Sequence, residues 1–171
     1  CPLCGGPLAL SGDGLACTAC VRRYPIQDGI AQLFVPNEWD ASTRDATPLV
    51  KTFYEENPFP NYEAFDSVQS FLEKARRGVF ARLLDEQLPP GVRILEAGCG
   101  TGQLSNYLGM TPGRRVIGTD LSMSSLRLGA RFARENRIDQ VTFCQMNLFR
   151  PPFRPGSFHL VISNGVLHHT S

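Results

Sequence analysis

The fold of this chain is decided by the stretch ILEAGCGTG at residues 94–102, where an apolar run meets three alternating glycines. The apolar run predicts a buried strand, and the residues after Gly102 predict a helix. Glycines at such a strand end leave out Cβ atoms, so a nucleotide-like cofactor can lie across it and contact the first helical turn. The dinucleotide fingerprint needs its third glycine at position 103, but that residue is Gln103. A nicotinamide-dependent oxidoreductase is therefore disfavoured.

An acidic residue, Asp120, ends the next predicted strand within the stretch VIGTDLS at residues 116–122. A carboxylate at this strand end can accept hydrogen bonds from both ribose hydroxyls of an adenosine. The same charge would repel a 2′-phosphate, which argues against NADP. The alternative role for Asp120 is to cap the helix that starts near Ser122.

Strands and helices alternate outward from this point. We expect a helix over 102–108, a strand over 115–119, a helix over 122–136, and strands over 141–146 and 158–163. This alternation predicts a Rossmann-like α/β fold with a parallel sheet and right-handed crossovers. Before it, apolar residues recur at three and four positions from Asp66 or Ser67 to Leu88 and predict one long amphipathic helix.

Cysteines mark the N-terminus as two Cys-x-x-Cys pairs, Cys1/Cys4 and Cys17/Cys20. This spacing lets four thiolates surround one Zn²⁺ as a closed tetrahedral site, which is structural rather than catalytic. Gly5 and Gly6 follow the first pair, where such a turn needs positive φ or a close backbone approach. Two disulfides or a redox pair are the alternatives, and both fit this pattern less well.

Composition narrows the class of protein. The 171 residues include 17 basic and 16 acidic side chains, for a net charge of +1, and 42% are hydrophobic. Near-neutral charge disfavours a polycationic nucleic-acid wrapper, and this apolar content can form a real core. No stretch approaches the roughly 18 apolar residues of a membrane span, and no secretory leader is evident. We expect a cytoplasmic protein with no membrane association and no obligate protein partner.

Four segments along the chain, ILEAGCGTG, GTDLS, VTFCQMNL and FHLVISNGVLHH, resemble the class I S-adenosylmethionine (SAM)-dependent methyltransferases in order and spacing. The cysteine module resembles the zinc ribbon of some bacterial ribosomal-RNA guanine methyltransferases and the small zinc-binding partner subunits of other RNA and protein methyltransferases. We therefore expect a zinc ribbon over 1–35, a linker over 36–47, a helical segment over 48–90 and a SAM-binding domain over 91–171.

The resemblance implies roles for individual residues. Glu96 would contact the methionine end of the cofactor through water, above a floor of Gly98, Gly100 and Gly102. Asp120 would bind the ribose, and Leu121 would pack on adenine. Further candidates follow in the C-terminal part: Asn147 for the adenine amino group, Ser163 and Asn164 beside the methionine moiety, and His168 and His169 as a general base or substrate orienter.

Two positions depart from the family pattern. Asn147 stands where the family usually has an aspartate, and His159 stands where it has an acid that braces the fourth strand. Tyr54 and Tyr62 are candidates for a lid, although packing is the simpler role. Trp39, the single tryptophan, is expected to pack the ribbon against the following domain.

The resemblance implies seven strands, of which this chain supplies four after residue 91. The chain also begins with Cys1 rather than Met. We therefore expect a fragment of a longer protein that is truncated at the C-terminus, exposes its fourth strand as an edge and is poorly active alone. The predicted function is methyl transfer from SAM to an RNA base or a small molecule. The alternative is a ribbon that binds RNA or protein beside a vestigial cofactor fold.

Overall fold

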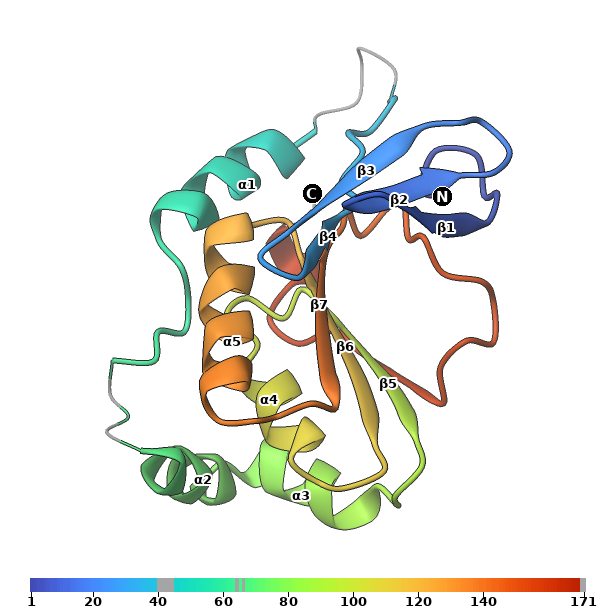
Figure 1. Ribbon diagram of the computed structural model, residues 1–171. Coiled ribbons are helices and arrows are strands. Elements are labelled where there is room, and N and C mark those ends of the chain that lie inside the picture. Colours follow the sequence, from blue (N-terminus) through green and yellow to red (C-terminus); the bar gives the residue numbers. More distant parts are fainter. Residues whose placement is uncertain (40–44, 64, 66, 170–171) are drawn as a thin grey trace.

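The computed structural model describes residues 1–39, 45–63, 65 and 67–169. One mixed sheet runs through the molecule in the order β1-β2-β3-β4-β7-β6-β5-β8, and helices α4 and α5 lie against one of its faces (Figure 1). Within the described residues, no helix has the length and apolar composition needed to cross a bilayer.

The C-terminal half of the sheet has the predicted parallel arrangement. Its strands are β5 (Arg93–Ala97), β6 (Arg115–Asp120), β7 (Val141–Gln145) and β8 (Leu160–Ile162). They pair in the order β7-β6-β5-β8, with every pair parallel. The crossovers are α4 (Gln103–Gly109) and α5 (Met123–Glu135). Because the strands are parallel, the ends of β5, β6 and β7 meet at one edge of the sheet, where ligands bind in such folds.

The N-terminal half corrects the expectation of a ribbon that merely precedes a four-stranded sheet. Strands β1 (Leu8–Ser11), β2 (Gly14–Cys17), β3 (Arg23–Gln27) and β4 (Ile30–Gln32) form an antiparallel meander. Strand β4 then pairs in parallel with β7, with Ala31 opposite Cys144, so the described chain forms one eight-stranded sheet. Ile30 of β4 is fully buried in the main core. Strand β4 therefore covers what would otherwise be an open edge at β7.

Asp28 and Gly29 form the turn between β3 and β4. Asp28 and Gly29 both have positive φ, at 56° and 79°, as a tight hairpin turn requires.

The prediction of one long helix up to Leu88 is wrong. The structure has two helices, α2 (Val68–Arg77) and α3 (Val79–Gln87), separated by Gly78 in an extended conformation with φ −72° and ψ 113°. Apolar periodicity continues across the break, but glycine has a low helix propensity, so the helix ends there. Ser67 caps α2 by accepting from the Ser70 N–H at 3.1 Å, and Asp66 lies outside the described residues.

Helix α1 (Thr47–Glu56) begins at Thr47, with Pro48 in its first turn. Its N-cap is Ala46, and the cap side chain is that of Asp45, which accepts from the Thr47 N–H at 2.9 Å. The chain ends in a short 3₁₀ helix, η1 (Leu167–His169).

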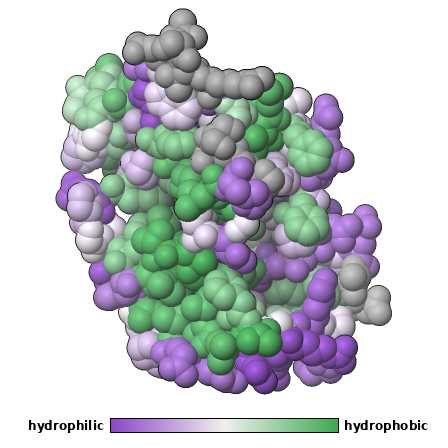
Figure 2. All heavy atoms as spheres, turned by 180° about the vertical axis from the view of Figure 1, so that it is seen from behind, coloured by the Kyte–Doolittle hydropathy of each residue, from purple (hydrophilic) through white to green (hydrophobic). Residues whose placement is uncertain are grey.

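Strand β8 is an edge of the sheet in the described part of the chain, as predicted, and its Val161 is 59% exposed. Apolar side chains also gather over the lower half of the molecule when it is seen from behind (Figure 2).

Candidate functional site

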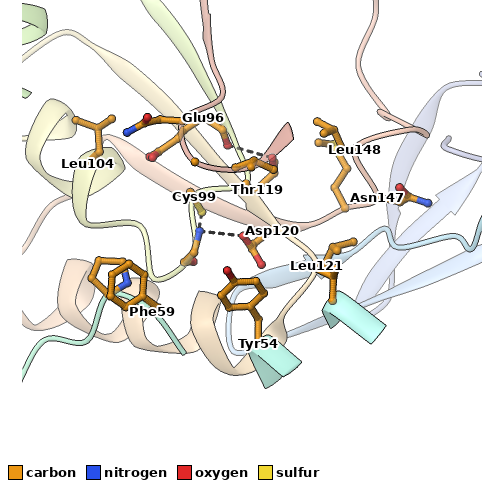
Figure 3. Close-up of a pocket in the computed structure, with 18 of the residues that line it drawn as sticks. Tyr54, Phe59, Glu96, Cys99, Leu104, Thr119, Asp120, Leu121, Asn147 and Leu148 are labelled. Atoms are coloured by element: carbon orange, nitrogen blue, oxygen red, sulfur yellow. Dashed lines mark hydrogen bonds between the residues drawn. The ribbon is translucent and has the colours of Figure 1, made fainter. Parts of the chain in front are cut away.

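A cavity of about 490 Å³ lies at the carboxyl ends of β5, β6 and β7. Its walls come from the loops that follow these strands, from α1, and from the segment around residues 59–60. Figure 3 shows Glu96 and Asp120 in this cavity, with Tyr54 of α1 facing Asp120 from the other side. The predicted residues that line it are Glu96, Gly98, Gly100, Asp120, Leu121, Asn147 and Asn164.

The glycine loop forms the floor of the cavity. Gly98, Gly100 and Gly102 all have positive φ, at 78°, 55° and 72°, a region in which side chains are strained. The N–H groups of Gly98 and Cys99 donate to the Thr119 carbonyl at 2.8 and 2.9 Å, which fixes the loop against the end of β6. Gly102 is not among the residues that line the cavity. A Cβ at this position would lie 2.3 Å from the Phe143 ring. Its role in the described structure is therefore close packing below the loop.

Asp120 connects the glycine loop to α5. Its Oδ2 accepts from the Gly100 N–H and its Oδ1 from the Ser122 N–H, both at 2.9 Å. Burial raises the pKa of this carboxyl above its usual value, while the Ser122 and Gly100 N–H groups act in the opposite direction. Each carboxylate oxygen has a second lone pair, so Asp120 can still accept from a ligand's hydroxyl groups. The N-cap of α5 is Ser122, whose hydroxyl accepts from the Ser125 N–H at 3.1 Å, whereas Asp120 holds the Ser122 N–H and faces the cavity.

Glu96 is a buried carboxyl at the far end of the floor, with 6% of its surface exposed. Its Oε2 accepts from the Ser105 hydroxyl at 2.5 Å. Burial raises the pKa of Glu96 to about 7, the Ser105 hydrogen bonds lower it, and the nearby Asp120 charge raises it further. A cation bound in the cavity would favour the ionised form of Glu96.

The segment 57–62 forms a wall over the glycine loop. The Phe59 carbonyl accepts from the Thr101 N–H at 3.2 Å, and the Thr101 hydroxyl donates to the Pro60 carbonyl. Gln103, noted above only as a missing glycine, donates to the Asn61 carbonyl at 2.7 Å. The proline-rich pattern gave no signal for these contacts, which join residues about 40 positions apart.

The two tyrosines considered as a lid have different roles. Tyr54 lines the cavity, facing Asp120. Tyr62 is a packing residue, because its ring stacks on Phe132 with centroids 4.5 Å apart and its hydroxyl donates to the Thr101 carbonyl at 3.0 Å.

Residues 94–171, which contain the glycine loop, Asp120 and the strands around the cavity, match the family model of the methyltransferase domain. By this match, residues 94–171 form a methyltransferase domain.

Among curated proteins, a probable fatty acid methyltransferase of Mycobacterium tuberculosis is 32% identical over 111 residues, covering 65% of this chain and 24% of that protein. A ubiquinone/menaquinone biosynthesis C-methyltransferase of Rhizobium leguminosarum is 29% identical over 101 residues, covering 57% of this chain and 39% of that protein. The chain spans less than half the length of the curated relatives it matches.

Solved structures show the same fold. Magnesium protoporphyrin IX methyltransferase of Synechocystis, solved with bound SAM, superposes with a TM-score of 0.55 at 23% identity, covering 77% of this chain and 67% of that one. Geranyl diphosphate C-methyltransferase of Streptomyces coelicolor gives a TM-score of 0.52 at 21% identity, covering 71% of this chain and 54% of that one.

Asn147 lies at the edge of the methyltransferase cavity with its side chain directed away from Asp120 (Figure 3). Its Nδ2 donates to the Val35 carbonyl at 2.9 Å and to Asn37 Oδ1 at 2.8 Å, and its Oδ1 accepts from the Phe149 N–H at 3.0 Å. Its predicted contact with adenine stays a prediction. The structure adds a role that the sequence did not indicate, which is to hold residues that follow the ribbon.

The remaining C-terminal candidates lie at or beyond the cavity mouth. Asn164 lines the methyltransferase cavity, whereas Ser163 is exposed and absent from the described lining residues. His168 is exposed on η1, and the side chain of His169 lies outside what the structure describes. A catalytic role for either histidine stays a prediction.

His159 replaces the usual acid with a brace of its own. Its Nδ1 accepts from the Arg93 N–H at 2.9 Å, and its N–H donates to the Arg93 carbonyl at 2.9 Å. This pair joins β8 to β5 at the start of both strands.

The four N-terminal cysteines converge as predicted, with all Sγ atoms within 4.8 Å of one another. The Cys1–Cys20 and Cys4–Cys17 sulfur pairs are 3.8 and 3.5 Å apart. A tetrahedral Zn²⁺ with bonds of about 2.3 Å places its sulfurs about 3.8 Å apart, so the cluster fits a zinc ion. Backbone N–H groups of Cys20 and Ala19 lower the pKa of Cys17 to about 7, which favours the thiolate.

The glycines beside the cysteine cluster act as expected. Gly5 has φ 71°, and a Cβ on Gly6 would lie 2.7 Å from the Ala19 Cβ. The likeness of this ribbon to those of ribosomal-RNA methyltransferases stays a prediction. Trp39 packs edge-to-face on Phe149 with ring centroids 4.8 Å apart, the packing role expected of it.

Proposed function

We propose that this protein binds SAM in the cavity at the ends of β5, β6 and β7 and transfers its methyl group to a small-molecule acceptor. The observation that carries the proposal is the junction of Gly100 and Asp120. A glycine backbone floor lies there beside the half-buried Asp120 carboxylate, which accepts from the N–H groups of Gly100 and Ser122. That arrangement suits an adenosine, and its register does not suit a dinucleotide.

The proposed ligand contacts follow the chain from strand to strand. Asp120 accepts from the ribose hydroxyls, Leu121 packs on adenine, and Asn147 closes the adenine end. Glu96 faces the methionine end, where ionisation of its carboxyl balances the positive charge of the ligand. Gly98 and Gly100 shape the floor with Gly102 packed beneath it, and Asn164 completes the methionine end beside Ser163.

When bound, SAM supplies an electrophilic methyl group on a sulfonium. The residues of this chain then have mainly to orient donor and acceptor for in-line displacement, and proximity and orientation can lower the barrier by about 7 to 11 kcal/mol. A general base from His168 or His169 would add a factor of about 10² to 10⁴ only for an acceptor that must lose a proton. Alanine at each position, with cofactor affinity unchanged, separates these cases. Unaltered transfer rates in both variants would refute a histidine base.

Relatives favour a small acceptor over RNA. Their names include a fatty acid methyltransferase, a quinone-biosynthesis methyltransferase and a malonyl-[acyl-carrier protein] O-methyltransferase. Arg127 of α5 pairs with Asp28 at 2.9 Å, so this guanidinium is engaged within the chain. One relative is named a SAM-dependent Diels-Alderase, so cofactor binding without methyl transfer is the second candidate.

Two assays test this function. Calorimetry with SAM and NADH tests the cofactor, and binding of NADH alone would overturn the assignment. The acceptor is tested by incubating the protein with SAM that carries a tritiated methyl group, together with a bacterial metabolite extract or total RNA. Label in the extract's small molecules is expected. Label confined to RNA would contradict the proposed acceptor class, and binding without any transfer would favour the second candidate.

We also propose that Cys1, Cys4, Cys17 and Cys20 hold one structural Zn²⁺. All four ligand positions are then protein thiolates, so no site remains for a reacting water. Elemental analysis should give one zinc per chain, and Cys4→Ser should lower that content. A metal-free protein with an intact ribbon would refute the assignment.

A further inference from the structure

The segment 33–37 connects the cysteine ribbon to the cofactor cavity. It follows β4 directly and continues alongside β7, where the Leu33 N–H donates to the Gln145 carbonyl at 2.9 Å. Leu33 and Val35 are buried in one small core with Cys1 and Cys17 of the ribbon. The position of this segment therefore depends on the folded ribbon.

Asn37, at the end of this segment, uses its side-chain amide to hold two walls of the cavity. Its Oδ1 accepts from Asn147 Nδ2 at 2.8 Å. Its Nδ2 donates to the Thr47 hydroxyl at 3.0 Å and to both carboxylate oxygens of Asp45 at 3.2 Å. Thr47 and Asn147 both line the cavity, although 100 residues separate them in the sequence.

Each contact fixes a different element. Thr47 begins α1, and Asp45, two residues before it, accepts from the Thr47 N–H; this helix carries Tyr54 into the cavity two turns later. Asn147 is 1% exposed and accepts from the Phe149 N–H, so its orientation fixes the lining residues Leu148 and Phe149. A side chain that satisfies a buried amide on one wall and the helix start on the other sets the distance between them.

We propose that Asn37 is a positioning residue for the cofactor site, through which the cysteine ribbon sets the shape of the adenine end of the cavity. The inference rests on the proposed function. It assigns the ribbon a role in cofactor binding in addition to any role in acceptor recognition.

The test is the affinity of S-adenosylhomocysteine for the full chain and for Asn37→Ala, measured by calorimetry. We expect about tenfold weaker binding, because the variant no longer holds the two cavity walls together and leaves the amide of Asn147 partly unpaired. The matched control is Asn136→Ala, which also removes an asparagine bond at a helix end, to the Phe132 carbonyl at 2.8 Å. It should bind as the wild type does.

Two further measurements separate positioning from loss of stability. Trp39, the only tryptophan, packs on Phe149 of the cavity wall, so its emission should change on ligand binding and shift to the red in Asn37→Ala. In a double-mutant cycle, Asn147→Ala should weaken binding and Asn37→Ala should add little to it. Asn37→Gln keeps the amide donor and acceptor but shifts both by one methylene, so it should also weaken binding and serves if the alanine variant does not fold.

The outcomes are distinct. If the wild type binds and the affinity of Asn37→Ala is within twofold of it, this inference alone is overturned. Additive effects of the two substitutions in the double-mutant cycle would have the same consequence. No binding by the folded wild type would overturn both the inference and the proposed function.

Discussion

Replacement of Gly100 by alanine tests how closely the segment 57–62 covers the glycine loop. A Cβ at this position would lie 2.2 Å from the Phe59 carbonyl oxygen, against a normal C···O approach of about 3.3 Å. The overlap is with backbone, so no side-chain rotation relieves it. The Phe59 carbonyl has to move, and its hydrogen bond from the Thr101 N–H is then lost.

The cost in unfolding free energy has three contributions. Gly100 has φ 55°, and a non-glycine residue in this region costs about 1 to 2 kcal/mol. Overpacking adds about 1 to 3 kcal/mol, and the lost hydrogen bond adds about 1 kcal/mol. Gly156 offers a matched control, because its φ is 73° and a Cβ there would meet nothing within 4 Å. Gly156→Ala therefore carries the conformational cost alone.

The assay is urea unfolding of both variants beside the wild type. Gly100→Ala should lower the free energy of unfolding by about 2 to 4 kcal/mol more than Gly156→Ala does, and it should also weaken SAM binding. Equal losses within 1 kcal/mol would show that the segment 57–62 does not press on the loop, and would refute the wall described for the cavity.

Three further predictions follow from the carboxylates. Glu55 accepts from the N–H groups of Met123 and Ser124 at 2.9 Å, which help lower its pKa to about 2, so Glu55→Gln should lower the free energy of unfolding by about 1 to 2 kcal/mol at pH 7. That loss should shrink as the pH falls from about 4.5 toward 2, and the exposed Glu56→Gln should show none. Asp85→Ala leaves the buried Arg114 guanidinium unpaired and should cost about 3 to 5 kcal/mol in the same assay, whereas Glu86→Ala should cost little. The pKa of Glu96 is raised to about 7, so the folded state holds this proton more tightly than the unfolded chain does. Its contribution to stability therefore grows as the pH falls from 8 to 5, and a pH–stability profile of Glu96→Gln that keeps this slope would contradict it.

The parallel half of the fold could be predicted because its determinants are local. Each strand is a short apolar run, each helix starts at a recognisable boundary, and Gly98 to Asp120 places the cavity at two consecutive strand ends. The cysteine cluster was predictable for the same reason, since the spacing within each pair determines where the sulfurs point.

What the sequence did not indicate are contacts between distant segments. No pattern in β4 shows that it pairs with β7, more than 100 residues away. Whether a strand edge stays exposed or is covered by another strand depends on the three-dimensional arrangement of the elements. Asn37 appeared only within a polar linker, yet its amide lies between two cavity walls. The break at Gly78 was missed because apolar periodicity continues through it, although one glycine suffices to end a helix.

The central claim is that the cavity at Asp120 binds an adenosine cofactor, and one calorimetric experiment tests it most directly. S-adenosylhomocysteine is titrated into the zinc-loaded wild type and into Asp120→Ala, with thermal unfolding confirming that both are folded. Saturable binding by the wild type that is lost or at least tenfold weaker in the variant is the predicted result. Equal binding by the two proteins, or none by the folded wild type, would contradict the claim.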